Sequence, residues 1–193
     1  MNAKPTDHQM NGPRAKDILL DEFLTLSAQG GDPAAMDRLV RRWHPRLVAH
    51  AWRLTGDRDL AEDAVQSGWG AILRGIGKLR DARAFPAWAY RIISRICAGE
   101  IGKLVKQRAL KAAVSAEPQE RPTQPDEPSE THRLQAAIRQ LPAGERAAIA
   151  LYHFEEMRVA EVAVALAVPV GTVKTRLMNA RKKLRAILEG EQS

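Results

Sequence analysis

The residues with the clearest chemistry lie on one predicted helix near the C-terminus, Val170 to Arg185. Four apolar residues recur there at helical spacing and predict a buried face: Val173, Leu177, Ala180 and Leu184. The rest of the helix surface carries no acid and consists of Lys174, Thr175, Arg176, Met178, Asn179, Arg181, Lys182, Lys183 and Arg185. A solvated helix usually mixes both signs of charge, so a face of one sign indicates contact with a polyanion. The chemistry indicated is nucleic-acid binding.

The segment before this helix shows how it would be positioned. An apolar helix from Arg158 runs into Leu166-Ala167-Val168-Pro169, and the basic helix begins directly afterwards. This order predicts a helix-turn-helix, in which one helix supports and the next lies in the DNA major groove. Gly171 and Thr172 would lie at the N-terminus of the second helix, where free backbone N–H groups and the helix dipole favour a phosphate.

The bulk composition fits a folded protein with an acidic partner. The chain has 193 residues, 45% of them hydrophobic, and a formal net charge of +7. No apolar run approaches the roughly 18 residues that a membrane span needs, and the N-terminus lacks the apolar core of a signal peptide. Cys97 is the single cysteine, which excludes an internal disulfide and agrees with a reducing compartment. We expect a cytoplasmic protein without membrane insertion.

The chain divides into helical segments separated by a polar, proline-rich stretch. We expect a flexible N-terminal tail over 1–16, a helical domain over 17–112, a linker over 113–130 and a second helical domain over 131–190. The linker has four prolines, several acids and almost no apolar residue, so it cannot bury enough surface to fold. No alternating strand pattern occurs. The fold class is therefore all-α, with two small helical domains joined by a flexible acidic linker.

Local signals place the helix boundaries of the first domain. Asp32-Pro33 is a cap followed by a residue suited to the first helical turn. Gly56 ends that helix, Asp57 or Asp59 caps the next, and Gly75 and Gly77 break it. A long helix starts near Phe85-Pro86, and in the second domain Leu141-Pro142 separates two helices.

Segments of both helical domains resemble a known protein family. The stretch LPAGERAAIALYHFEEMRVAEVAVALAVPVGTVKTRLMNARKKLR resembles the fourth domain of bacterial RNA polymerase sigma factors, above all the extracytoplasmic-function (ECF) group. RLVRRWHPRLVAHAWRLTGDRDLAEDAVQSGWGAI and RAFPAWAYRIISR are similar to sigma domain two. The order of the two domains, with a linker between them, is that of the ECF group. The resemblance spans about 17–188.

The resemblance implies an alternative sigma factor that binds core RNA polymerase and directs promoter-specific initiation. Domain two would contact core polymerase through Asp59, Glu62, Asp63 and Gln66. It would capture the melted −10 strand, which needs a stacking face and a basic cradle, through Lys78, Arg80, Arg83, Trp88, Tyr90, Arg91, Arg95 and Lys103. The four tryptophans otherwise fit a helical core, and Trp88 is a stacking candidate only jointly with Tyr90.

Domain four would read the −35 element in the major groove. Gly171 and Thr172 would hold a phosphate, and the first two turns would reach base edges through Lys174, Thr175, Arg176, Met178 and Asn179. Lys182 and Lys183 would contact phosphate and position the helix without specifying sequence. The family also implies an anti-sigma factor as a partner.

The sequence departs from the family pattern at several positions. Ser67-Gly68 and Trp69-Gly70 follow the glutamine of DAVQ, and a glycine inside a helix costs roughly 1 kcal/mol relative to alanine. Core-polymerase affinity would be weaker than usual if that helix is loosened. Ala167 replaces the glycine usual in the helix-turn-helix turn, and an alanine can be accommodated there if its φ is negative.

Other classes of function have little support in the sequence. The five histidines are scattered and form no metal-ligand pattern with Cys97, and no Gly-rich phosphate loop or nucleophile–base arrangement occurs. We expect no enzyme activity, cofactor, metal or small-molecule substrate. Two alternatives stay open: a sigma-like decoy that binds an anti-sigma factor, and a simple helix-turn-helix regulator that uses only its C-terminal domain.

Overall fold

The computed structural model of the chain describes residues 15–114 and 130–190. Within these ranges every regular element is helical and none is a strand, which confirms the predicted all-α fold class. The tail predicted over 1–16 and the linker predicted over 113–130 lie outside the described residues except at their edges, which are helical.

The N-terminal unit contains four helices, α1 (Ala15–Gln29), α2 (Pro33–Thr55), α3 (Arg58–Gly75) and α4 (Phe85–Val114). Short 3-10 turns at Ile76–Lys78 and Ala82–Ala84 connect α3 to α4. The predicted boundaries are confirmed. The Asp32 carboxylate accepts a hydrogen bond from the Ala34 N–H at 2.9 Å, and Gly56 ends α2 with a φ of 74°.

The core of this unit forms where α2, α3 and α4 pack on one another. Trp43 on α2 is buried and lies edge-on to Phe85 and to Tyr90 on α4, with ring centroids 5.5 Å and 5.8 Å apart. Pro45 lies inside α2, which nevertheless continues as one helix to Thr55. The buried aromatic rings fix α4 against α2.

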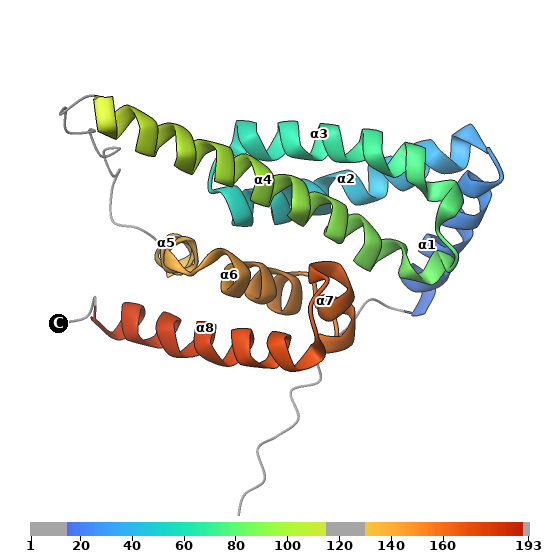
Figure 1. Ribbon diagram of the computed structural model, residues 1–193. Coiled ribbons are helices and arrows are strands. Elements are labelled where there is room, and N and C mark those ends of the chain that lie inside the picture. Colours follow the sequence, from blue (N-terminus) through green and yellow to red (C-terminus); the bar gives the residue numbers. More distant parts are fainter. Residues whose placement is uncertain (1–14, 115–129, 191–193) are drawn as a thin grey trace, which may run out of the picture.

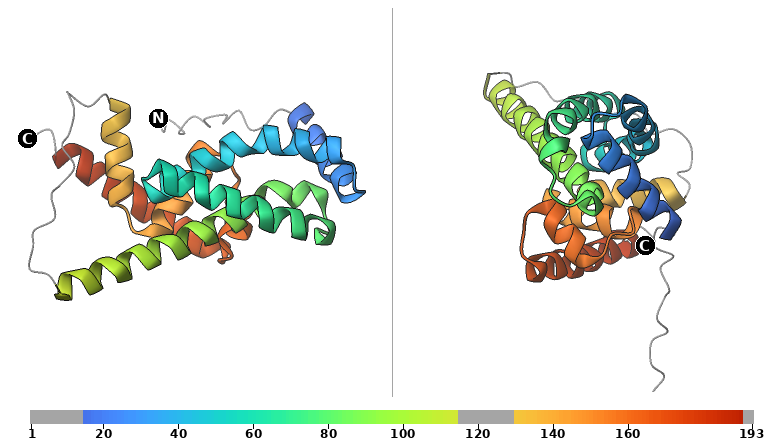
Figure 2. Two further views of the ribbon diagram at one scale, coloured as in Figure 1. Left: turned by 90° about the horizontal axis from the view of Figure 1, so that it is seen from above. Right: turned by 90° about the vertical axis from the view of Figure 1, so that its right-hand side faces the viewer.

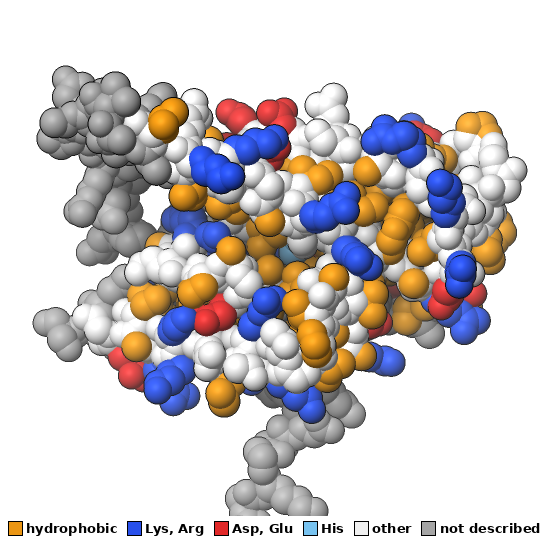
Figure 3. Space-filling view, viewed as in Figure 1, with side chains coloured by type: hydrophobic (Ala, Val, Ile, Leu, Met, Phe, Trp, Pro, Cys, Tyr) orange, Lys and Arg blue, Asp and Glu red, His pale blue; other side chains and the backbone are white. Residues whose placement is uncertain are grey.

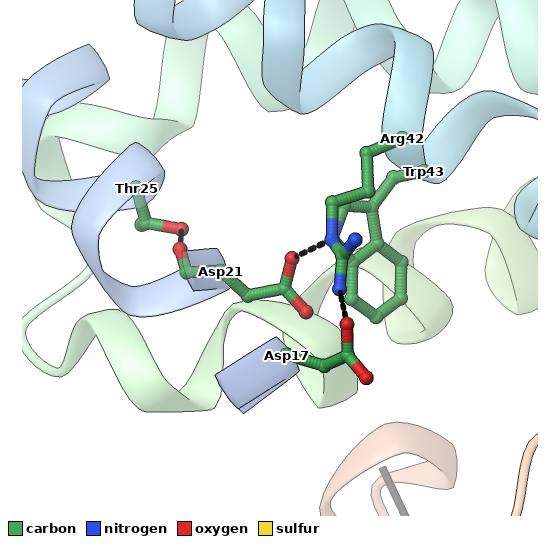
Figure 4. A network of polar contacts seen from close by, with 5 residues as sticks. All are labelled: Asp17, Asp21, Thr25, Arg42 and Trp43. Carbon is green, nitrogen blue, oxygen red and sulfur yellow. Dashed lines mark hydrogen bonds and ion pairs between the residues drawn. The ribbon is translucent and has the colours of Figure 1, made fainter. Parts of the chain in front are cut away.

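A polar network attaches α1 to α2 (Figure 4). The Arg42 guanidinium binds Asp17 at 2.8 Å and also binds Asp21, and these two carboxylates raise the pKa of Arg42 further. The Trp43 indole N–H donates to Asp21 at 3.0 Å, and the Thr25 hydroxyl donates to the Asp21 carbonyl at 2.7 Å. Asp21 is buried, so these partners compensate the cost of removing its charge from water.

The C-terminal unit contains α5 (Glu130–Gln140), α6 (Ala143–Ile149), a π-helical turn η3 (Ala150–Phe154), α7 (Val159–Leu166) and α8 (Val170–Gly190). Leu141-Pro142 separates α5 from α6, as predicted. Helices α7 and α8 form the predicted helix-turn-helix.

Ala167 does not meet the condition of a negative φ. Its φ is 52°, in the left-handed region, and the helix-turn-helix forms nevertheless. The Ala167 N–H donates to the carbonyl of Val164 at 3.2 Å, and the Val168 N–H donates to that of Ala163 at 3.0 Å. These bonds end α7 as a left-handed cap. Ala167 therefore has the conformation that glycine usually has at the end of a helix.

The two units pack on each other as two layers of helices. Figures 1 and 2 show α5, α6, α7 and α8 lying beneath α2, α3 and α4. Much of the junction consists of α7 against α4, and of α2 against the segment from α5 to η3. No helix in the described ranges is long and apolar enough to cross a membrane.

Candidate nucleic-acid interface

Helix α8 carries its predicted buried seam and its predicted basic face. Val173, Leu177 and Ala180 are buried against the rest of the unit, and Leu184 is half-buried on the same side. Outside the seam, the predicted DNA-binding residues on α8 are exposed or half-buried: Gly171, Thr172, Lys174, Thr175, Arg176, Met178, Asn179, Lys182 and Lys183. The structure therefore brings all nine to the surface of one helix.

Three of these residues already have partners in the protein. The Thr175 hydroxyl donates to the Gly171 carbonyl at 3.1 Å. The Lys183 ammonium binds Glu145 of α6 at 2.8 Å, although we predicted that it contacts phosphate. The Arg176 guanidinium lies against Gly144, where an added β-carbon would be 3.0 Å from its Cζ. Lys174, Met178 and Lys182 instead project from the helix as exposed side chains.

The basic residues predicted to capture the −10 strand lie around the start of α4 and along its exposed side. Lys78, Arg80, Arg83, Arg91, Arg95 and Lys103 are exposed or half-buried. Two of them pair with acids, Arg83 with Glu22 at 3.0 Å and Lys103 with Glu100 at 2.8 Å. Exposed pairs of this kind contribute little stability and separate readily for another anion.

The two aromatic candidates on α4 do not form one stacking face. Trp88 is half-buried and lies beside Phe85 and against Gly75, where a β-carbon would be 2.9 Å from the indole Cζ2. Tyr90 is buried and its ring contacts His50, with centroids 5.0 Å apart. Residues two apart point to different sides of a helix, so the expected joint platform is not assembled in this conformation.

The predicted polymerase-contact residues share one side of α3. Asp59, Asp63 and Gln66 lie at spacings of four and three residues, which places them on one helix face. Glu62 is half-buried and lies 3.5 Å from the Nε2 atom of His44, whose Nδ1 atom accepts a hydrogen bond from Trp69 at 3.3 Å. The exposed residues Asp59, Asp63 and Gln66, the acidic stripe of α3, are thus available to a partner, whereas Glu62 lies beside His44.

Sequence reasoning missed one charged residue at the junction of the two units. Glu155 follows η3, is only 7% exposed and accepts a hydrogen bond from Arg53 of α2 at 2.7 Å. The Tyr90 hydroxyl also donates to Glu155, and burial together with this carboxylate raises the pKa of Tyr90. The sequence contains two adjacent glutamates, 155 and 156, and no local signal distinguishes the buried one from the exposed one.

A cavity of about 320 Å³ also lies between the units and brings predicted DNA-binding residues together. Arg91 and Arg95 of α4 line one side, and Arg146 of α6 and Arg176 of α8 line the other. Burial lowers the pKa of Arg146. Figure 3 shows Lys and Arg side chains around the junction of the two layers, with apolar surface between them.

The comparisons with known proteins identify the family. Residues 39–104 match the family described as Sigma-70 region 2, and residues 131–184 match Sigma-70, region 4. The chain is 30% identical over 87% of its length to the ECF RNA polymerase sigma factor SigM of Mycobacterium tuberculosis, of which it covers 84%. The chain belongs to the ECF RNA polymerase sigma factors.

Other relatives agree with this assignment to the ECF sigma factors. SigE of Mycolicibacterium smegmatis is 31% identical over 84% of the chain, which spans 66% of that relative's length. A solved structure of the sigma factor RpoE in complex with the anti-sigma factor NepR, from Bartonella quintana, matches with a TM-score of 0.66 at 21% identity. That match covers 80% of this chain and 96% of the other and shows a shared fold.

The family match covers the site residues of both units. Region 2 includes the acidic stripe of α3 and the basic side of α4, and region 4 includes the helix-turn-helix as far as residue 184. The predicted family and the predicted class of transcription factor are therefore confirmed. This ECF sigma factor acts in transcription initiation with RNA polymerase, and its sigma-70 regions belong to a family of non-catalytic regulatory factors.

Proposed function

We propose that this chain directs initiation at promoters with a −35 and a −10 element, using α8 for the first and the α4 region for the second. The observation that carries the proposal is the exposed, acid-free face of α8 over a buried apolar seam, in a chain of the ECF sigma family. This function operates in the cytoplasm, where core polymerase and promoter DNA are present, and it uses binding alone without catalysis.

In the −35 complex, α8 enters the major groove with its N-terminal turns foremost. Lys174, Met178 and Asn179 project from these turns and contact base edges, where direct hydrogen bonds and apolar contacts discriminate sequence. Lys182 lies further along the helix and contacts the phosphate backbone. Phosphate contacts supply affinity that depends on salt and not on sequence.

In the −10 complex, the exposed cations at the start of α4 and along its side follow the backbone of the separated strand. Arg91 and Arg95 are one helical turn apart and present adjacent guanidinium groups. Trp88 offers the aromatic edge that is accessible in this region. The Tyr90 ring is buried against Trp43 and His50 of its own unit, and its hydroxyl binds Glu155 of the C-terminal unit. Stacking on aromatic faces tolerates many bases, so it holds an opened strand.

The exposed acidic stripe of α3 contacts core RNA polymerase, with Asp59, Asp63 and Gln66 as its centre. The chain also takes an anti-sigma factor as a partner, in keeping with the complex of RpoE and NepR, whose sigma factor shares this fold. Such a partner would hold the sigma factor away from polymerase until it is released.

Run-off transcription with purified core polymerase and a pool of genomic promoter fragments tests the proposal. We expect discrete transcripts that require the added chain and whose start sites share a −35 and a −10 element. Absence of chain-dependent transcripts across the pool would contradict it. The matched variant is Asp63→Asn with Asp37→Asn as control, because both aspartates lie on helix surfaces but only Asp63 belongs to the α3 stripe.

Packing accounts for part of the motivation of the decoy alternative. Its support was the altered polymerase-binding helix from Ser67 to Gly70; within it, Gly68 lies where α3 packs on α4, and a β-carbon there would be 2.2 Å from Ile93 Cδ1. The glycine therefore has a packing reason that does not require loss of polymerase binding. A pull-down that retains core polymerase strongly argues against the decoy.

A further inference from the structure

A buried carboxylate lies at the junction of the two units. Glu155 of the C-terminal unit contacts three side chains of the N-terminal unit: Arg53 Nη1 at 2.7 Å, Arg46 Nε at 4.0 Å and the Tyr90 hydroxyl. Charge-assisted hydrogen bonds, such as those that Arg53 and Tyr90 donate to Glu155, are stronger than neutral ones. The same Arg53 guanidinium lies over the Phe154 ring, 4.5 Å from its centroid, so it holds the C-terminal unit by two kinds of contact.

This contact differs from the exposed ion pairs elsewhere in the chain. The Glu155 side chain is 5% exposed and that of Arg53 is 22% exposed, whereas Arg41 and Asp37 are 79% and 56% exposed. A buried carboxylate that loses its cation is costly, but here both partners return to water when the units separate. The contact therefore stabilises one arrangement of the units without being needed for the fold of either.

The closed arrangement keeps duplex DNA out of the space between α8 and α4. Arg176 of α8 and Arg91 and Arg95 of α4 face the same cavity of about 320 Å³. A cavity of that volume does not admit duplex DNA, whose major groove alone is roughly 12 Å wide. Duplex DNA cannot reach these side chains together, and Tyr90 is covered as well.

We propose that Glu155 is a latch that holds the free sigma factor in a closed, DNA-excluding form by binding Arg53 and Tyr90 across the junction. Opening of the latch separates α8 from α4 and gives DNA access to Arg176, Arg91 and Arg95 together, whereas Lys174, Met178 and Lys182 are exposed in the closed form as well. The part of this proposal that concerns DNA rests on the proposed function, whereas the closed form does not.

Small-angle X-ray scattering of the free, full-length chain tests the latch. We expect Glu155→Gln to raise the radius of gyration by at least ~3 Å above that of the wild type, where a compact chain of this length has roughly 16 Å. The control is Glu156→Gln, which removes the same charge one residue away at an exposed position. We expect it to leave the radius unchanged.

A second variant guards against a simple folding defect. Arg53→Met removes the cation from the opposite side of the junction and keeps an apolar stem of similar length against Phe154. We expect the same expansion as for Glu155→Gln, with helix content by circular dichroism equal to that of the wild type. A wild-type chain that is already expanded, or latch variants that keep its radius, would overturn the proposal.

DNA binding by the free chain provides the functional readout. The apparent affinity for DNA that must contact both units scales with the open fraction, so we expect Glu155→Gln to bind a promoter duplex with both elements about tenfold more tightly than the wild type. Equal affinity of the expanded variant and the closed wild type would overturn the DNA-excluding role. Failure of the proposed function would instead abolish chain-dependent transcripts while leaving the scattering difference intact, so the two failures are distinguishable.

Discussion

Gly68 of α3 faces Ile93 of α4 so closely that a β-carbon at position 68 would lie 2.2 Å from Ile93 Cδ1. Gly68 is buried in the helix, and Ile93 is among the largest fully buried side chains. The glycine that looked like a weakness of α3 in the sequence is thus what lets α3 and α4 approach.

Replacing this glycine destabilises the protein. We expect Gly68→Ala to lower the free energy of unfolding by about 1 to 3 kcal/mol, the usual cost of overpacking a core. Gly70→Ala is the control, because the nearest atom there is the flexible end of Arg74 at 3.4 Å. We expect Gly70→Ala to raise the free energy of unfolding by about 0.5 to 1 kcal/mol, because alanine has the higher helix propensity.

Ile93→Val tests the cause, because it removes the δ1 methyl that a β-carbon at 68 would meet. We expect the Gly68→Ala, Ile93→Val double variant to lose less stability than the sum of the two single variants. Urea unfolding followed by circular dichroism measures all four proteins. Additive losses would show that the clash is not the cause.

On α8, we expect Lys174→Ala and Asn179→Ala to weaken binding to the preferred −35 sequence by about 1 to 3 kcal/mol each, with little effect on other sequences. Lys182→Ala is expected to lower affinity evenly and to reduce the slope of log K against log salt by about 1. Gel shifts with holoenzyme over a salt series separate the two patterns. A sequence-dependent loss for Lys182→Ala would reverse the assignment.

His50 gives the protein a pH dependence. It is fully buried, and burial followed by the charge of Arg53 lowers its pKa from 6.5 to about 3. The unfolded chain binds a proton below pH 6.5 that the folded chain does not, so stability is lost as pH falls from 6.5 towards 3. At pH 5 the loss is about 2 kcal/mol relative to neutral pH.

We expect His50→Gln to lower stability at neutral pH but to flatten its decrease between pH 6.5 and about pH 5. The pKa of His153 is also lowered, and comparing the variant with the wild type cancels its contribution. Urea midpoints at each pH give the two curves. Parallel curves would exclude His50 as the titrating group.

Ala167 has a left-handed backbone, with a φ of 52°, at the end of α7. We expect Ala167→Gly to raise the free energy of unfolding by about 0.5 kcal/mol, because glycine adopts this conformation without the steric cost of a β-carbon. Ala160→Gly is the control, since Ala160 is exposed in the first turn of the same helix and its replacement is expected to cost up to about 1 kcal/mol. Thermal unfolding of the two variants shows opposite shifts if the φ is the cause.

Local chemistry was enough to predict the helices and the two-region architecture. Asp32-Pro33, Gly56 and Leu141-Pro142 each act within one or two turns of chain, and each marks a boundary in the structure. The apolar seam of α8 was likewise predictable, because its burial follows from residues three and four apart on one helix.

The parts that could not be predicted depend on segments far apart in the chain. Tyr90 and Glu155 are 65 residues apart, and nothing near either shows that they meet. Lys183 looked free for phosphate because its partner Glu145 lies 38 residues away. The φ of Ala167 escaped prediction because its turn is set by two backbone hydrogen bonds and not by the side chain.

The cation-lined cavity makes the packing of the two units depend on ionic strength. Arg91, Arg95, Arg146 and Arg176 repel one another across it, and no acid is among its lining residues in the described part of the chain. Dissolved salt screens that repulsion more than it screens the buried Glu155 contact. Rising salt therefore favours closing at the same time as it weakens phosphate contacts. The DNA affinity of the free chain is expected to fall with salt more steeply than its count of phosphate contacts alone would give.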